Sequence, residues 1–288
     1  MLESLINPKR VDKGPWKMFF VGLLYASLSL ILVQAFFSGD AVLSKFSGLM
    51  VVTFCVMFSL PFMYYIIKQE EREDEEMAGL FSVWKIHKDA VFALLWLFLG
   101  FVIAFSFWNL VLGNPLLLNA QLETYCLINP GQGSLEYCIE MNSMGGSVSF
   151  PTGNSINSAR FLSILENNAS VLIFTLIFSL IFGAGAIFVL AWNATVIASA
   201  IGIFTSYKIV QIPLGLARYM IHGLPEIAAY FIAALAGGIL GVGFIKNGVN
   251  SKKFMKVLEN VIILLFISVI ILILAAVVEV YLTPLLFK

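Results

Sequence analysis

Residues 261–282 read VIILLFISVIILILAAVVEVYL, and Glu279 is the only charged side chain among them. A helix needs about 20 apolar residues to cross the hydrocarbon core of a bilayer. A helix also pairs its backbone polar groups internally, which lipid demands of any segment that crosses it. This stretch is therefore predicted to span a membrane, and it makes lipid rather than water the solvent of the fold.

The same pattern recurs along the chain. Five further apolar stretches of spanning length occupy residues 18–37, 46–67, 90–112, 169–192 and 227–245. Over all 288 residues, 60% are hydrophobic and 12% are charged, whereas soluble domains are about half apolar and about a quarter charged. The predicted fold class is all-α: a polytopic transmembrane helical bundle with six to seven membrane segments, in the cell membrane.

The basic residues predict the orientation of these segments. Lys and Arg concentrate in residues 1–17, 68–89 and 246–256, and short loops rich in these residues face the cytoplasm. Residues 113–168 contain only Arg160 as a basic side chain and are expected outside. The N-terminus is therefore predicted to be cytoplasmic.

Residues 193–225 are the ambiguous part of this topology. Because residues 246–256 are expected in the cytoplasm, the stretch 227–245 must end there and begin outside. A segment between residues 193 and 225 must then bring the chain back to the outer side of the membrane. We favour a seventh membrane segment, which places the C-terminus outside the cell. The alternative is a re-entrant hairpin over residues 194–245.

The chain divides into three regions. Residues 1–112 form a three-helix membrane region with a charged cytoplasmic loop at 68–89, residues 113–168 an extracytoplasmic loop cap, and residues 169–288 a C-terminal membrane core. The cytoplasmic loop contains the run QEEREDEE at 69–76. This run is either a solvated extension of the preceding helix or a docking site for a protein partner.

The cysteines lead to a further prediction for the outer loop. Cys126 and Cys138 lie there with 11 residues between them, and two cysteines outside the cell typically form a disulfide. Two free thiols are the alternative. A metal site is not expected, since no histidine lies nearby. Nucleic acid is not an expected partner either, because the chain has no basic stripe to neutralise phosphates.

Three ionisable side chains lie in the C-terminal membrane region, where each is a candidate functional residue. On a continuous helix His222 and Glu226 would share a face at four-residue spacing. Pro225 is predicted to begin a helix there, which puts Glu226 in its first turn and His222 in the turn before it, still within hydrogen-bond reach of Glu226. Glu226 and Glu279 each lie about 30–35 Å from the cytoplasmic ends of their segments. We therefore predict that Glu279 approaches His222 or Glu226 directly or through one water. Two close carboxylates resist double ionisation, so a proton or a cationic His222 is expected to be shared.

Small residues form a seam on the same segment. Ala229, Ala233, Gly237 and Gly241 recur every four residues, and Gly183 lies in the preceding span. Small side chains let two membrane helices approach backbone to backbone. Packing within one chain is the favoured interpretation, with a dimer interface or a transport pathway as alternatives.

The sequence contains no complete catalytic or metal-binding set. His222 and Glu226 resemble half of a zinc site, but the only other histidine, His87, is predicted on the opposite face of the membrane. A zinc centre needs three or four ligands. We therefore expect no cofactor and no metal. The sequence does not decide whether the protein is an enzyme, although it favours a protein without catalysis over an intramembrane hydrolase.

The order of several short motifs carries a family resemblance. The motifs are Asn7-Pro8-Lys9-Arg10 with Trp16, Glu166-Asn167-Asn168, Gly183 with Gly185, Trp192-Asn193-Ala194, His222-Gly223-Leu224-Pro225-Glu226, Ala275-Ala276-Val277-Val278-Glu279 and Thr283-Pro284. In this order they resemble the stage II sporulation protein M family, and the first motif resembles its archaeal members. The resemblance supports a polar cluster of His222, Glu226, Glu279, Asn168 and Asn193.

The resemblance implies a membrane protein that has no catalytic activity of its own and works with partner proteins. In spore-forming bacteria the family member belongs to an engulfment machine that remodels the cell wall, and its partners carry the hydrolase activity. The first functional hypothesis is therefore a membrane scaffold or assembly component, oligomeric and in contact with lipid. The alternative is a transporter or channel for an ion, a proton or a lipid that uses the His and Glu cluster.

Overall fold

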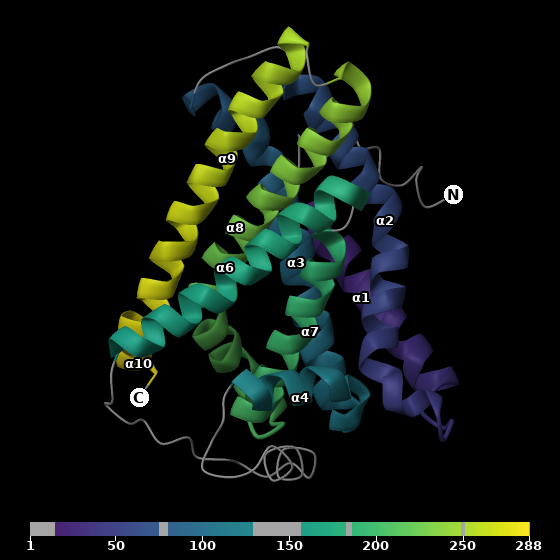
Figure 1. The fold of residues 1–288 in the computed structure, drawn as a ribbon. Coiled ribbons are helices and arrows are strands. Elements are labelled where there is room, and N and C mark those ends of the chain that lie inside the picture. Colours follow the sequence, from purple (N-terminus) through teal and green to yellow (C-terminus); the bar gives the residue numbers. More distant parts are fainter. Residues whose placement is uncertain (1–14, 75–79, 129–156, 183–185, 249–250, 288) are drawn as a thin grey trace.

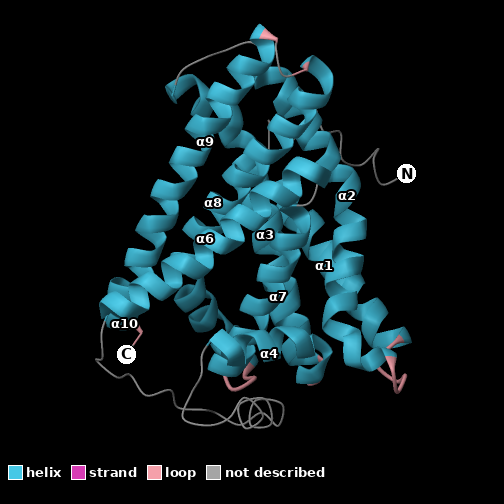
Figure 2. Ribbon diagram, in the orientation of Figure 1, coloured by secondary structure: helices cyan, strands magenta, loops and turns pink. Residues whose placement is uncertain are grey.

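The computed structural model describes residues 15–74, 80–128, 157–182, 186–248 and 251–287, and every element in these ranges is helical (Figures 1 and 2). The α-helices are α1 (Lys17–Phe36), α2 (Ser47–Asp74), α3 (Leu80–Val111), α4 (Asn119–Ile128), α6 (Asn157–Phe182), α7 (Ala186–Phe204), α8 (Ile212–Asn247), α9 (Lys252–Val277) and α10 (Thr283–Leu286). The short elements are the 3₁₀ turns η3 (Leu43–Phe46), η4 (Pro115–Leu118) and η5 (Ile209–Gln211), and the π-helical turn η6 (Val278–Leu282).

Seven helices in the described part of the chain are long and apolar enough to cross a membrane. They cover residues Lys17–Phe36, Leu43–Met63, His87–Val111, Phe161–Ile181, Ile187–Phe204, Ile209–Lys246 and Lys252–Leu286. The predicted all-α membrane class is confirmed. The predicted side of each terminus stays a prediction, because length and composition carry no orientation.

The predicted span 169–192 is wrong as a single helix. Helix α6 ends at Phe182 and α7 begins at Ala186, so the apolar run is divided between two membrane segments. The sequence between them, Gly183 to Gly185, contains two glycines, which are poor helix formers. Hydropathy alone does not register this division because the residues on both sides are equally apolar.

The ambiguous residues 193–225 belong to two helices. Their first part completes α7, and their last part begins α8, which continues to Asn247. Each helix is long enough to cross by itself, in agreement with a seven-segment count. The prediction that Pro225 begins a helix is wrong, since Pro225 lies inside α8. Neighbouring groups in membrane bundles re-satisfy the backbone bond that such a proline removes.

The loops that flank these helices are shorter than predicted. Helix α6 begins at Asn157, inside the region predicted as outer loop. Residues 69–74 of the acidic run continue α2, as a solvated helical extension would. The rest of that run and residues 129–156 of the predicted outer cap lie outside the described residues, as do residues 183–185.

Helix α3 forms the centre of the amino-terminal half. Its side chains Phe98, Phe101 and Phe105 are fully buried. Helix α1 crosses α3 where Gly22 meets Gly100, and a Cβ on either glycine would collide with a backbone carbonyl of the other helix. The two glycines therefore permit a crossing at backbone distance.

Asp40 stabilises the turn between α1 and α2. Its Oδ1 accepts hydrogen bonds from the backbone N–H groups of Val42 and Leu43, both at 2.8 Å. Hydrogen bonds to a carboxylate favour the charged form, and these two lower the pKa of Asp40 below its ordinary value of 3.8.

We expect the contribution of this turn to stability to vanish in acid. Because the folded-state pKa of Asp40 is lowered, its contribution is present above the unfolded pKa and is lost as the pH falls through the folded one. Carbon-13 NMR of labelled aspartate in micelles should give Asp40 a titration midpoint below 3.8. A midpoint at or above that value would contradict the hydrogen-bonded turn.

Candidate functional site

The candidate site lies where α6, α8 and the end of α9 meet. Helix α6 crosses the bundle obliquely (Figure 1), and it contacts α9 and η6. Helix α8 packs along both α6 and α9. Asn168 comes from α6, His222 and Glu226 from α8, and Glu279 from η6. Of the five residues predicted to form the polar cluster, these four are brought together.

Glu226 is the centre of this arrangement. Asn168 Nδ2 donates to Glu226 Oε1 at 2.9 Å, and the Asn168 side chain is buried. The side chain of Glu279 also lies against the carboxyl group of Glu226. Two ionised carboxylates offer no donor hydrogen, so a direct hydrogen bond between them needs a proton on one of the two.

His222 makes the next contact, one turn along α8. Its Nδ1 lies 3.3 Å from Thr283 Oγ1, and Thr283 Oγ1 donates its hydrogen to Val278 O at 3.1 Å. Which of the two groups donates in the contact between His222 and Thr283 depends on the tautomer of the imidazole ring. Thr283 was not among the predicted cluster residues, although its spacing of four from Glu279 mirrors the spacing of His222 from Glu226.

Arg218 makes a third contact, one further turn along α8. Its Nη1 donates to Phe287 O at 3.2 Å, and its guanidinium lies 4.6 Å from the centre of the Phe204 ring. The three contacts join Glu226 to Glu279, His222 to Thr283 and Arg218 to Phe287. We call this antiparallel set the C-terminal ladder, since its positions advance by four residues on each side.

The π-helical turn η6 contributes to the ladder. The backbone N–H of Thr283 bonds to Val278 O, five residues back, which is the π pattern. Such turns are rare and occur mostly at functional sites. Through this turn, Glu279 and Thr283 both contact α8.

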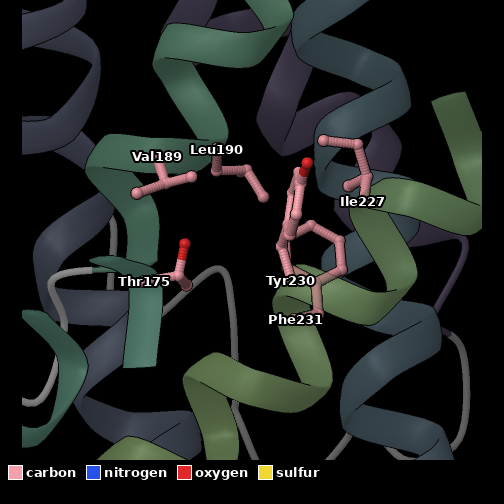
Figure 3. A pocket seen from close by; sticks show the side chains of 6 residues that line it. All are labelled: Thr175, Val189, Leu190, Ile227, Tyr230 and Phe231. Atoms are coloured by element: carbon pink, nitrogen blue, oxygen red, sulfur yellow. The ribbon is translucent and has the colours of Figure 1, made fainter. Parts of the chain in front are cut away.

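Tyr230 lies one turn inward from Glu226 on α8. The side chain is buried. It lines a crevice of about 190 Å³ with Thr175, Val189, Leu190, Ile227 and Phe231, and none of that space is wide enough for a water molecule. In Figure 3 the Tyr230 hydroxyl points between Leu190 and Ile227. The crevice is therefore closely packed, whereas His222, Glu226 and Glu279 themselves are half-buried.

Asn193, the fifth residue of the predicted cluster, lies on α7. Its Nδ2 donates to Val189 O, one turn earlier in the same helix, at 2.8 Å. This bond is internal to α7 and does not join Asn193 to the ladder.

The predicted small-residue seam faces α6. Ala229 and Ala233 are fully buried, and a Cβ on Gly237 or Gly241 would collide with a backbone carbonyl of α6. These residues therefore serve close packing between two helices of one chain. Gly183, the fifth predicted seam residue, lies outside the described residues.

The cysteines occupy two environments. Cys126, on α4, is disulfide-bonded, and Cys55 is free and buried in the bundle. Cys138 lies outside the described residues, so its pairing with Cys126 stays a prediction. In the described ranges, no three His, Cys, Asp or Glu side chains are grouped closely enough to hold a metal ion.

Comparison with protein families supports the motif order. The model of the family described as Stage II sporulation protein M matches residues 50–284. The chain belongs to the stage II sporulation protein M family. The match confirms the resemblance and includes α8 and η6, so most of the ladder lies within the family region. Comparison with curated proteins and with solved structures gave no match.

Proposed function

We propose that this member of the stage II sporulation protein M family is a membrane scaffold or assembly component without catalysis of its own. The observation that carries the proposal is that the polar side chains within the membrane segments bond to other helices. Asn168 donates a hydrogen bond to Glu226, and Glu279 lies against Glu226, so the three side chains connect α6, α8 and η6. Ionisable groups in a membrane are functional candidates by default, and here they connect helices.

Close packing next to the cluster supports the same function. The crevice beside Tyr230, one turn from Glu226, has no space for a water molecule. Packing of this kind favours a fixed helix arrangement, on which other proteins can assemble.

The acidic run at 69–76 is the proposed contact for a protein partner on the cytoplasmic side. It combines six acidic residues with one arginine, a charge that complements a basic surface. A second copy of the chain is the other expected partner, within the membrane.

Purification from native membranes in a mild detergent tests this function. We expect the protein to have the mass of at least a dimer by light scattering, or to retain a partner at a fixed molar ratio. Neutralising the acidic run with Gln and Asn should release that partner. The exposed Glu259 on α9 provides a matched control, because Glu259→Gln should release nothing. A monomer without partner, before and after chemical cross-linking, would contradict the proposal.

Transport of an ion or a proton is the second candidate. It is favoured by the ionisable side chains of α8, which extend inward from Arg218 through His222 to Glu226. Liposomes that contain the protein and a pH-sensitive dye test it. A proton flux that Glu226→Gln abolishes would favour transport over the scaffold, and the absence of flux in both proteins would favour the scaffold.

A further inference from the structure

Lysines are concentrated at the turn between α8 and α9. Lys246 lies in the last turn of α8, and Lys252, Lys253 and Lys256 lie in the first turns of α9. These four side chains are exposed. One membrane-spanning stretch ends at Lys246 and the next begins at Lys252. The positive charge is therefore concentrated where the chain leaves the bilayer and returns to it.

Contacts between the two helices place these lysines at one level. A Cβ on Gly243 would lie 3.1 Å from Val257 Cγ1, and the ring centres of Phe244 and Phe254 are 6.2 Å apart. The end of α8 thus lies alongside the first turns of α9. The turn is at the end of the molecule opposite to α4 (Figure 1). Its lysines form one group, at one surface of the membrane.

Exposed apolar side chains lie among the lysines. Phe244 is 53% exposed, Ile245 is 85% exposed and Met255 is 57% exposed. Exposure of such side chains to water is unfavourable, whereas the boundary between headgroups and acyl chains accepts them. A lysine at that boundary lays its methylene groups along apolar surface and keeps its ammonium group among the headgroups. The composition of this turn is therefore that of a surface in the headgroup layer.

We propose that the turn between α8 and α9 binds the headgroup of an anionic phospholipid, whose phosphate contacts Lys252 and Lys256. These two residues are four apart on α9, so their side chains are neighbours on one helix face. Clusters of four or more basic residues next to a membrane helix attract anionic lipids. The proposal goes beyond the scaffold function and does not depend on it.

The neighbouring groups determine which lysines carry the site. Lys246 and Lys253 make further interactions within the chain, so the site is assigned to Lys252 and Lys256. Glu259 is exposed on α9, three residues after Lys256, and its negative charge weakens the attraction for a phosphate. Glu259→Gln should therefore strengthen lipid binding.

The apolar side chains favour a lipid over a free phosphate ion. Both ligands would use the same ammonium groups. A free ion would leave Phe244, Ile245 and Met255 in contact with water, whereas the acyl chains of a bound lipid cover them. A lipid therefore accounts for both the charge and the apolar surface of the turn.

Fluorescence quenching in vesicles tests the site. The reporter is bimane on Met255→Cys. Bimane on Val42→Cys is the matched control, because Val42 is 63% exposed at the other end of the molecule, next to a membrane-spanning stretch and near the exposed Lys45. The vesicles contain phosphatidylcholine and phosphatidylglycerol in equal parts in both leaflets, and one of the two lipids carries a quenching spin label near its headgroup. The parent chain, labelled in the same way, gives the background from the native cysteines.

We expect labelled phosphatidylglycerol to quench the reporter at residue 255 about threefold more strongly than labelled phosphatidylcholine, and the reporter at residue 42 about equally. Combining Lys252→Gln with Lys256→Gln should lower the ratio at residue 255 to that at residue 42. The two corresponding arginine substitutions should preserve it, because they keep the charge. Salt at about 1 M should abolish the preference, since the Debye length falls to about 3 Å.

Three results would overturn the proposal. Equal quenching by the two lipids at residue 255 would mean that the charge of the lysines is neutralised within the chain. A preference that persists in the double glutamine variant would place its source elsewhere. Loss of the preference on addition of inorganic phosphate, at constant ionic strength, would assign the site to the free ion.

Discussion

Glu226→Leu is expected to lower the free energy of unfolding by about 4 kcal/mol, because it leaves two polar partners without Glu226 inside the bundle. Asn168 Nδ2 loses its acceptor at 2.9 Å, and Glu279 loses the carboxyl against which it lies. Unfolding by denaturant in mixed micelles, monitored by the fluorescence of the five tryptophans, measures the change.

Glu226→Gln is the matched control for this substitution. The amide keeps an oxygen for Asn168 and offers a donor to Glu279, so the expected loss is about 1 kcal/mol or less. Equal losses for leucine and glutamine would mean that the hydrogen bonds of Glu226 do not contribute to the stability of the bundle. The same pair of substitutions at Glu279 should follow the same order.

Gly237→Ala is expected to destabilise the protein by about 3 kcal/mol, since a methyl group at this position collides with a backbone carbonyl of α6. Neither helix can relieve this contact by a side-chain rotation, and overpacking of this kind costs about 1–3 kcal/mol or more. The same unfolding measurement applies.

Gly223→Ala is the control within the same helix. A Cβ there meets its nearest atoms, on Met220 and Ile197, at 3.7 and 3.8 Å, which is ordinary contact. Alanine in place of a helix-interior glycine should then stabilise by about 0.5–1 kcal/mol. If both substitutions change stability by the same amount, the close approach of α8 to α6 is contradicted.

The number of membrane segments could be predicted from the sequence for two independent reasons. Hydropathy located most spans, and the position of the basic residues 246–256 required a return of the chain between residues 193 and 225. The division between α6 and α7 could not be predicted, because the apolar run 169–192 has no charged residue to mark it. The continuation of α8 through Pro225 depends on its neighbours, which a local rule about proline does not include.

Part of the candidate site could also be predicted from the sequence. Depth along each segment placed Glu226 and Glu279 at one level, and the structure brings their carboxyl groups into contact. The contact of Arg218 was not accessible, since its acceptor is the backbone carbonyl of Phe287, which no side chain identifies. The contact of Thr283 depends on the π turn, and that turn arises from packing rather than from a recognisable motif. Asn193 resembles the family motif but makes its hydrogen bond within its own helix.

The π turn also determines how the end of the chain tolerates changes in length. If η6 took the regular α-helical pattern at its present length, everything after it would rotate by about 100° around the axis. Thr283 and Phe287 would then turn away from α8, while Glu279, before most of the turn, would keep its place. Substitutions on the exposed face of this segment should be accepted readily, whereas an inserted residue between Glu279 and Thr283, beyond the one that the π turn already takes up, should not. The spacing of these two residues is thus under a stricter constraint than the identity of the apolar residues between them.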